Sequence, residues 1–171
     1  QFTLDLSDFL FPESSYQMSK ADDPITAAPL GPHGECSLMH LVRRAGQYST
    51  TCWTQCVDTG LSAVQYAILV VLEEETICDQ QTLGNRAGFD KATGSYLIDR
   101  MSKGGLLCVE VDADNRRRKL VKMTTEGEVM LNRMIEQAKQ AEELIAQRLD
   151  TQDVADLKRL LSKLGGLHEP E

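Results

Sequence analysis

Residues 79–103 read DQQTLGNRAGFDKATGSYLIDRMSK, and they predict two short helices joined by a tight turn. Asp79 is a favoured capping residue for a helix over 80–87, which Gly88 ends in the left-handed conformation. Asp90 caps a second helix over 91–103, which stops at a pair of glycines. Two short helices connected by a turn that contains glycine are typical of the helix-turn-helix motif.

A hairpin is predicted directly after this helix pair. Residues 106–111 alternate in the manner of a strand, and residues 118–123 alternate again. The residues between them, 112–117, have the composition of a turn. A two-stranded wing attached to the second helix makes the motif a winged helix-turn-helix.

Further helices are predicted on both sides of the winged motif. Apolar residues recur at helical spacing over 36–57, and Ser62 caps a second helix that begins at residue 63. Thr124 caps a long helix that continues to residue 149, and a last helix over 152–164 starts at Thr151. Four apolar residues form a heptad-like seam on this last helix: Val154, Leu157, Leu161 and Leu164.

Charge is distributed unevenly along the 171 residues, whose formal net charge is −8. Residues 79–123 contain nine Lys and Arg but only six Asp and Glu, so a basic segment lies within an acidic protein. This asymmetry predicts that one face of the molecule meets a polyanion. The sequence has neither an apolar run of about 18 residues nor the pattern of a signal peptide, so a soluble, cytoplasmic protein is expected.

The elements together predict a mainly α fold with a small two-stranded β wing, a winged helix-turn-helix flanked by N- and C-terminal dimerisation helices. The flanking helices carry more apolar surface than a domain of this size can cover alone, so we expect a homodimer. Packing of the terminal helices within one chain is the alternative. We expect an arm or linker over 1–34, where four of the five prolines lie, a first dimerisation helix over 35–60, a DNA-binding lobe over 61–123 and C-terminal dimerisation helices over 124–171.

The cysteines predict free thiols in place of a disulfide framework or a zinc site. Their number, five, is odd, and no C-x-x-C pair is present. Cys52 and Cys56 share a helix face but lack a second pair of ligands. No Gly-rich phosphate loop and no nucleophilic set of Ser, His and acidic residues is recognisable. We therefore expect no metal, no cofactor and no enzymatic activity.

In their order and spacing, the motifs after residue 35 resemble the MarR family of bacterial transcriptional regulators. Residues 79–101 are similar to the helix-turn-helix of the family, and residues 116–127, RRRKLVKMTTEG, are similar to its wing and the start of its fifth helix. The family wing carries Asp-x-Arg at a set distance before a Leu-Thr pair, and here Asn115 and Arg117 stand at these two positions. Within the family, residues 40–47 and 63–69 are similar to the nicotinate-catabolism repressor type.

The resemblance implies that a dimer binds double-stranded DNA at a pseudo-palindromic operator. The second helix of the motif is expected to enter the major groove, and the wing arginines the minor groove. Four apolar residues of that helix are expected to face the body of the protein: Ala92, Leu97, Ile98 and Met101. The predicted DNA-binding residues are Lys91, Thr93, Gly94, Ser95, Tyr96, Arg100, Arg116, Arg117 and Arg118.

Three of these assignments have alternatives. Gly94 is expected to allow close approach to DNA, or else it only loosens the helix. Arg100 either contacts guanine or forms an ion pair with Asp99 or an acid of the wing. The three wing arginines have no acid in sequence reach after Asp114, and their alternative is a solvated surface patch. We expect replacement of Arg117 by Ala to weaken operator binding at least tenfold.

A small-molecule site is a further hypothesis. A cation, an imidazole and a phenol on one helix face suit an aromatic carboxylate, because the arginine fork matches the carboxylate oxygens. The family resemblance indicates an effector that releases the operator, a small aromatic or pyridine carboxylate such as 6-hydroxynicotinate. Six residues are expected to line the site: His40, Arg43, Arg44, Tyr48, Gln65 and Tyr66. The alternative for Arg43 and Arg44 is that they form ion pairs across the dimer. Trp53 is expected in the core.

Two other kinds of protein compete with this interpretation. A thiol-based redox regulator of the same family would use Cys36, at the start of a helix, or Cys108, in the wing. A winged helix can also serve protein contacts, or DNA architecture without sequence preference.

Overall fold

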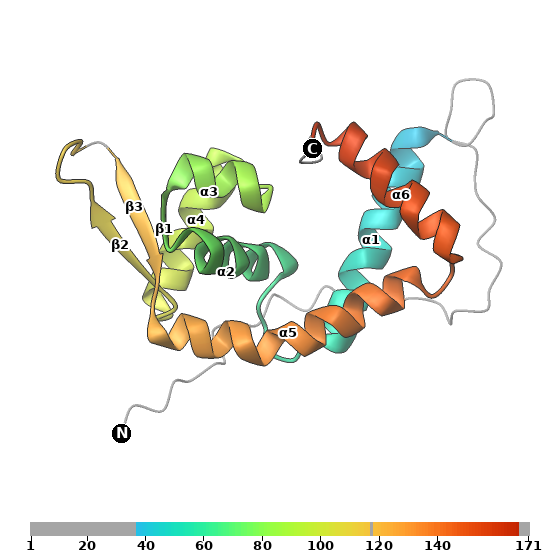
Figure 1. The fold of residues 1–171 in the computed structure, drawn as a ribbon, viewed down its shortest axis with the longest axis horizontal. Helices are drawn as coiled ribbons and strands as arrows, with labels where there is room; N and C mark the ends of the chain where they lie inside the picture. The colour runs from blue at the N-terminus through green and yellow to red at the C-terminus, as the bar shows by residue number, and fades with distance from the viewer. Residues whose placement is uncertain (1–36, 117, 168–171) are drawn as a thin grey trace. The chain divides into compact units, whose positions relative to one another are not determined.

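The computed structural model of the protein describes residues 37–116 and 118–167. The predicted arm over 1–34, Cys36 and Arg117 lie outside these residues. Along the described parts of the chain, six helices and three strands follow one another (Figure 1). They are α1 (Leu38–Cys56), α2 (Ala63–Glu75), β1 (Ile77–Asp79), α3 (Gln80–Ala87), α4 (Lys91–Lys103), β2 (Leu107–Val111), β3 (Lys119–Met123), α5 (Thr125–Ala146) and α6 (Thr151–Leu164).

The helices of the helix-turn-helix begin and end where their capping residues predict. Asp79 accepts hydrogen bonds from the first backbone N–H groups of α3, and Asp90 does the same for α4. Gly88 ends α3 with a φ of 78°, a left-handed conformation that suits glycine. At the far end of the chain, α5 stops at residue 146, before the predicted 149. α6 begins at Thr151 as expected, and its capping residue is Asp150.

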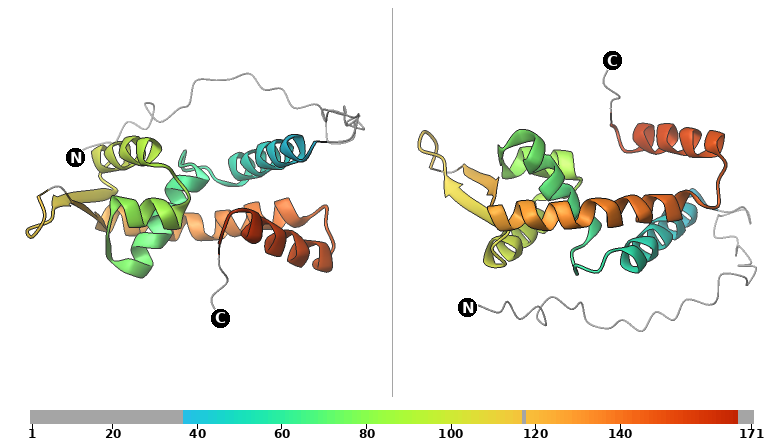
Figure 2. Two further views of the ribbon diagram at one scale, coloured as in Figure 1. Left: turned by 90° about the horizontal axis from the view of Figure 1, so that it is seen from above. Right: turned by 60° about the horizontal axis from the view of Figure 1, so that its bottom comes forward.

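The wing is the predicted β2–β3 hairpin, but its sheet contains a third strand. In the antiparallel order β1–β3–β2, Cys78 of β1 lies opposite Val121 of β3. A strand of three residues is too short to show an alternating pattern, so the sequence did not predict it. Figure 2 shows the β2–β3 hairpin projecting beyond the helices on which it is anchored. The mainly α winged helix-turn-helix fold is confirmed.

The core within residues 49–167 holds the helix pair and the sheet together. Leu69 of α2, Leu83 of α3, Met101 of α4, Val121 of β3 and Leu131 of α5 are all fully buried. α4 and the β2–β3 wing are therefore packed on the same apolar core. On α4, Ile98 and Met101 face inward as predicted and Leu97 is half-buried, whereas Ala92 is exposed and its prediction was wrong.

The chain divides after Tyr48 into two compact units, which are described separately. In the first, the large apolar side chains of Leu38, Met39, Leu41 and Val42 are exposed. In the second, Asp58 accepts hydrogen bonds from Arg133 at 3.1 and 3.2 Å and thereby ties the α1–α2 connection to α5. Among the described residues, no helix combines the length and apolar composition needed to span a membrane.

Candidate nucleic-acid interface

The exposed face of α4 carries the polar side chains that were predicted to read DNA. Lys91, Thr93, Ser95 and Tyr96 are all exposed, and Tyr96 is 61% exposed. Arg100 is partly exposed, and its guanidinium donates a hydrogen bond to the Tyr96 hydroxyl at 3.2 Å. A helix with this face offers donors and acceptors to the edges of base pairs.

Gly94 does not belong to this face, so its expected approach to DNA was wrong. The residue is buried in the lobe. A Cβ atom built on it would lie 2.3 Å from Cε2 of Phe89, which is inside any normal contact distance. Gly94 is therefore required by the packing of an aromatic ring. Helical spacing contains no signal for this contact, because Phe89 belongs to the preceding turn.

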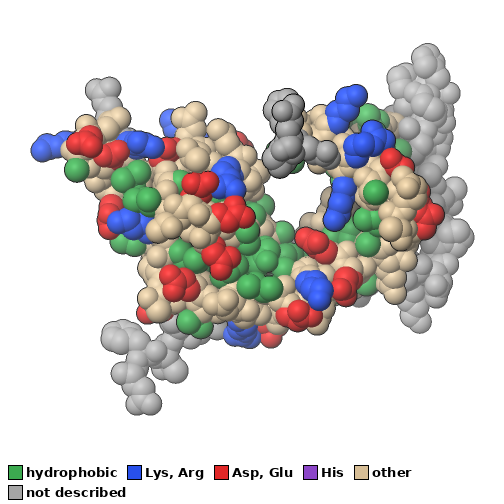
Figure 3. Space-filling view, viewed as in Figure 1, with side chains coloured by type: hydrophobic (Ala, Val, Ile, Leu, Met, Phe, Trp, Pro, Cys, Tyr) green, Lys and Arg blue, Asp and Glu red, His purple; other side chains and the backbone are tan. Residues whose placement is uncertain are grey.

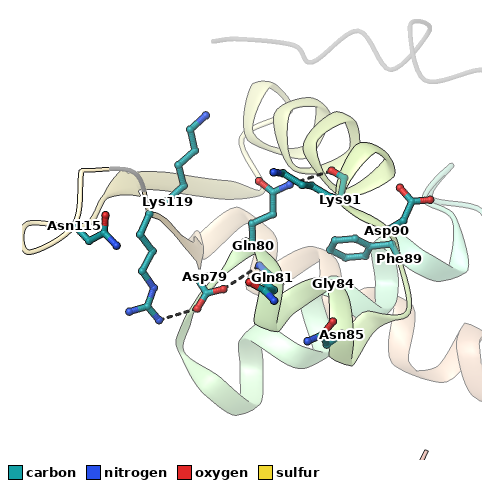
Figure 4. Close-up of a pocket in the computed structure, with 11 residues that line it drawn as sticks. Asp79, Gln80, Gln81, Gly84, Asn85, Phe89, Asp90, Lys91, Asn115 and Lys119 are labelled. Carbon is teal, nitrogen blue, oxygen red and sulfur yellow. Dashed lines mark hydrogen bonds and ion pairs between the residues drawn. The ribbon is translucent and has the colours of Figure 1, made fainter. Parts of the chain in front are cut away.

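A groove of about 800 Å³ lies between the start of the helix pair and the wing (Figure 4). Lys119 and Asn115 come from the wing, while Gln80 and Lys91 come from α3 and α4. Gln80 also joins the two helices, because its amide donates a hydrogen bond to the Ser95 hydroxyl at 2.8 Å. The groove therefore lies where a strand of nucleic acid would contact both reading elements at once.

Three cations around this groove have no acidic partner within the described parts of the chain. Lys91 and Lys119 line the groove, and Arg116 lies at the tip of the wing; all three are exposed. Other cations of the lobe are neutralised, since Lys103 pairs with Asp99 at 2.7 Å. The lining also contains two carboxylates, Asp79 and Asp90, against the three cations Lys91, Arg118 and Lys119, so the groove keeps a small positive excess. In a protein of net charge −8, this excess, together with Arg116 at the wing tip, favours attraction of phosphates.

Arg118 is paired with carboxylates in the described chain, and its contact with DNA stays a prediction. Its Nη2 lies 2.7 Å from Oδ2 of Asp79, and its Nη1 lies 3.6 Å from Oδ2 of Asp112. The sequence argument considered only acids close to the arginines in the chain. Pairing of β1 with β3 places Asp79 opposite Leu120, which brings a distant carboxylate to the wing.

Asp79 connects the wing with the start of α3. Its Oδ1 accepts hydrogen bonds from the backbone N–H groups of Gln81 at 2.9 Å and Thr82 at 3.0 Å. The N–H of Thr82 and then the guanidinium of Arg118 lower the pKa of this carboxyl from 3.8 to about 2. The same ion pair raises the pKa of Arg118. The carboxylate thus stays charged and links the two elements that flank the groove.

The residues predicted for a small-molecule site lie on two helices. His40, Arg43, Arg44 and Tyr48 are in the first half of α1, where Arg43 donates a hydrogen bond to Nδ1 of His40 at 2.9 Å. Gln65 and Tyr66 are in the first turn of α2.

Gln65 is a capping residue, so its prediction as a ligand contact was wrong. It is 3% exposed, and its Oε1 accepts a hydrogen bond from the backbone N–H of Ser62 at 2.9 Å. The Ser62 hydroxyl in turn accepts from the N–H of Gln65 at 3.3 Å. The Ser-x-x-Gln pattern of this capping box was visible in the sequence and could have assigned the role.

Tyr66 lines a cavity of about 470 Å³ formed by the second half of α1, α2, α3 and α5. Its ring centroid lies 5.5 Å from that of Trp53, which also lines the cavity and donates its indole N–H to the carbonyl of Leu61 at 2.7 Å. The assignment of Trp53 to the core therefore missed a cavity residue. In Figure 3, apolar side chains gather over α2 and α5 with acidic side chains beside them. Burial, with the charges of Glu142 and Glu73, raises the pKa of the Tyr66 hydroxyl.

The described cysteines are free thiols in different surroundings. Cys52 and Cys78 are buried, Cys56 is half-buried and Cys108 is exposed on the wing. Burial raises the pKa of the Cys78 thiol. Within residues 37–116 and 118–167, no group of three or more His, Cys, Asp or Glu side chains is placed to hold a metal ion.

Comparisons with known proteins place these features among regulators of transcription. A model of the MarR family matches residues 59–118. The transcriptional repressor NicR of Pseudomonas putida is 29% identical over 126 residues, which are 73% of this chain and 80% of NicR. The structure of Bordetella bronchiseptica BpsR, studied for the regulation of its DNA binding by 6-hydroxynicotinic acid, has a TM-score of 0.68 at 28% identity and covers 74% of this chain and 96% of BpsR.

A second structure, that of PcaV from Streptomyces coelicolor in complex with its natural ligand, gives a TM-score of 0.72 at 28% identity. The match covers 77% of this chain and 94% of PcaV. NicR is named as a transcriptional repressor and PcaV as a transcriptional regulator, while BpsR is named as a protein whose DNA binding is regulated.

Proposed function

Because this chain belongs to the MarR family of transcriptional regulators, we propose that it binds a specific operator as a dimer and represses transcription until a small aromatic or pyridine carboxylate releases it. The uncompensated cations around the α4–wing groove are the observation that carries the DNA-binding part of this proposal. A protein that binds an operator must be in the same compartment as the DNA, so a cytoplasmic location is part of the proposal.

In the proposed complex, α4 enters the major groove and the wing follows the adjacent minor groove. Thr93, Ser95 and Tyr96 face base edges or phosphates, while Arg116 at the wing tip meets the negative potential of the minor groove. Lys91 and Lys119 neutralise phosphates between the two elements. Arg118 links the wing to the start of α3 through its ion pair with Asp79.

A second copy of the chain is proposed to pack against the flanking helices. α6 has no buried residue in the single chain, and Leu157, Leu160, Leu161 and Leu164 are 40–61% exposed. Burial of such leucines between two subunits contributes about 25 cal/mol per Å² of apolar surface. The two recognition helices of a dimer would then meet half-sites about 10 bp apart, centre to centre.

The effector part of the proposal is supported by ligand chemistry and by similarity. BpsR, whose DNA binding is regulated by 6-hydroxynicotinic acid, is similar over most of its length. Here, the cavity beside Trp53 and Tyr66 is large enough for one pyridine or benzene ring. In the first unit, which is considered separately from this cavity, the Arg43 guanidinium is linked to His40 and has the chemistry to bind a carboxylate. A tenfold loss of operator affinity requires a coupling free energy of only about 1.4 kcal/mol.

Selection from random double-stranded DNA by the full-length protein tests the regulator function. We expect one imperfect palindrome to be enriched, and fluorescence anisotropy to show weaker binding of that duplex by Arg116→Ala at matched salt. Lys139→Ala removes the same charge from α5, away from the groove, and is expected to bind as the wild type does. Equal enrichment of all duplexes would identify an architectural or protein-contact module and reject the proposal.

Calorimetry with nicotinate, 6-hydroxynicotinate and salicylate tests the effector, in the presence and absence of the selected operator. We expect at least one acid to bind the free protein and to weaken operator binding, and Arg43→Gln to lose the response. Absence of binding by all three would remove the carboxylate effector. If operator binding were instead lost with peroxide and retained in Cys108→Ser, the thiol-based alternative would be supported.

A further inference from the structure

One aromatic ring fills the space between the two helices of the helix-turn-helix. Phe89 lies in the turn that joins α3 and α4, directly after the left-handed Gly88. Its backbone N–H donates to the carbonyl of Gly84 at 3.0 Å, which anchors the residue on α3. Its half-buried ring also lines the groove that is proposed to face DNA (Figure 4).

Both helices have a glycine where the ring touches them. A Cβ atom at Gly94 of α4 would lie 2.3 Å from Cε2 and 2.6 Å from Cδ2 of Phe89. A Cβ atom at Gly84 of α3 would lie 3.0 Å from the same Cε2, and 2.9 Å from the backbone oxygen of Phe89. The ring edge therefore occupies the positions that two side chains would otherwise take, and both glycines are buried.

The contact between the Phe89 ring and Gly94 requires a glycine inside α4, which lowers the stability of the helix. A glycine inside a helix is less favourable than alanine by about 1 kcal/mol, and Gly94 lies in the interior of α4, on its buried side. Its neighbours Thr93 and Ser95 are both exposed. Because packed interiors transmit small displacements, the ring beneath Gly94 fixes the height and tilt of these two side chains.

We propose that Phe89 is a positioning residue that, through its contact with Gly94 and Gly84, sets the angle at which α4 is presented and thereby sets which operator is read. The inference rests on the proposed reading of DNA by α4. Since the uncompensated Lys119 and Arg116 belong to the wing, attraction to the DNA backbone does not depend on the ring. The ring governs discrimination between sequences, and the wing cations govern general affinity.

The test uses four variants of the full-length protein: Gly94→Ala, Phe89→Leu, the double variant of both, and Gly84→Ala. Anisotropy measures binding to the selected operator and to a duplex with both half-sites scrambled, at the same salt concentration. The ratio of the two affinities is the readout, because loss of stability alone would not change it. Gly46→Ala is the matched control, since a Cβ atom at Gly46 meets nothing within 4 Å.

We expect Gly94→Ala to lower the affinity ratio at least tenfold while binding of the scrambled duplex stays within twofold of wild type. Phe89→Leu added to Gly94→Ala should return the ratio to within threefold of wild type, because the three atoms nearest to a Cβ at Gly94 all belong to the ring. The same leucine should rescue Gly84→Ala poorly, because the carbonyl oxygen of Phe89 remains in place. If Gly94→Ala does not fold, the double variant is still expected to fold and to discriminate.

Two results would overturn the inference. One is a Gly94→Ala variant with the wild-type affinity ratio; the other is a folded double variant that does not regain discrimination. Either result leaves the proposed function intact, since the wild type would still select an operator. A wild type that prefers no duplex rejects the proposed function and this inference with it.

Discussion

Replacement of Asp79 by Asn is expected to release the wing from α3 while leaving the helix cap in place. Asn caps a helix about as well as Asp does, so the hydrogen bonds from Gln81 and Thr82 are retained. The variant loses the negative charge and the Oδ2 acceptor, which lies 2.7 Å from the guanidinium of Arg118 and 3.1 Å from the hydroxyl of Thr82. The change therefore isolates the ion pair from the cap.

The size of the effect follows from the acidity of the carboxyl. A pKa of about 2 in place of 3.8 corresponds to about 2 kcal/mol for all the interactions that favour the charged form of Asp79. The backbone N–H groups supply the larger part and remain available to Asn. Because the side chain is 18% exposed and its partner half exposed, screening leaves about 1 kcal/mol for the pair with Arg118. Replacement by Ala should cost about 1 kcal/mol more, through loss of the cap.

The effect depends on pH in a defined direction. The folded pKa of Asp79 is depressed, so its contribution to stability is complete above the unfolded value near 4 and is lost as the pH falls toward 2. The difference in free energy of unfolding between the wild type and Asp79→Asn should therefore shrink below pH 4. It should be small at pH 2, where the carboxyl is about half protonated in the folded state and almost fully protonated in the unfolded state.

Urea unfolding followed by circular dichroism measures this difference at pH 7 and at steps down to pH 2. Asp90→Asn is the control, because Asp90 caps α4 and has no ion pair with any residue of the described chain; its stability should match that of the wild type. Equal stability of Asp79→Asn and the wild type at pH 7 would refute the reasoning. A difference that persists unchanged at pH 2 would refute it as well.

Three further results are expected. Lys119→Ala should make the plot of log affinity against log salt less steep, by about 0.9 per subunit. Lys103→Ala should change the steepness less, because the Lys103 ammonium is already paired with Asp99 in the wild type. The difference between ultraviolet titrations of the wild type and Tyr66→Phe should have a midpoint above pH 10.0; a midpoint at or below that pH contradicts the burial of this phenol. Mass spectrometry should find Cys108 alkylated before the buried Cys78, and the reverse order would be inconsistent with their exposures.

The helix-turn-helix could be predicted to the residue because its signals are local. A carboxylate cap acts within three residues, and a left-handed glycine ends the helix that precedes it. Asp79, Gly88 and Asp90 therefore fixed the bounds of α3 and α4 without knowledge of the fold. The exposed positions of α4 followed from helical spacing in the same way, apart from Ala92, which is exposed, and Gly94, which is buried.

The errors in the candidate site concern contacts between residues that the chain brings together only on folding. Arg118 finds its carboxylate 39 residues away, because β1 pairs with β3. The ring that requires Gly94 comes from the turn, and helical spacing alone cannot predict a side chain that enters from outside the helix. Gln65 differs, because its capping pattern with Ser62 was visible but was given a ligand role.

The central claim is that two copies of an acidic protein read DNA through the basic surface formed by α4 and the wing of each copy. Footprinting of the protein on its selected duplex tests this claim most directly. Two equal protected stretches about 10 bp apart, with two subunits bound per duplex, are the predicted result. Protection at arbitrary positions, or saturation by one subunit, would contradict it.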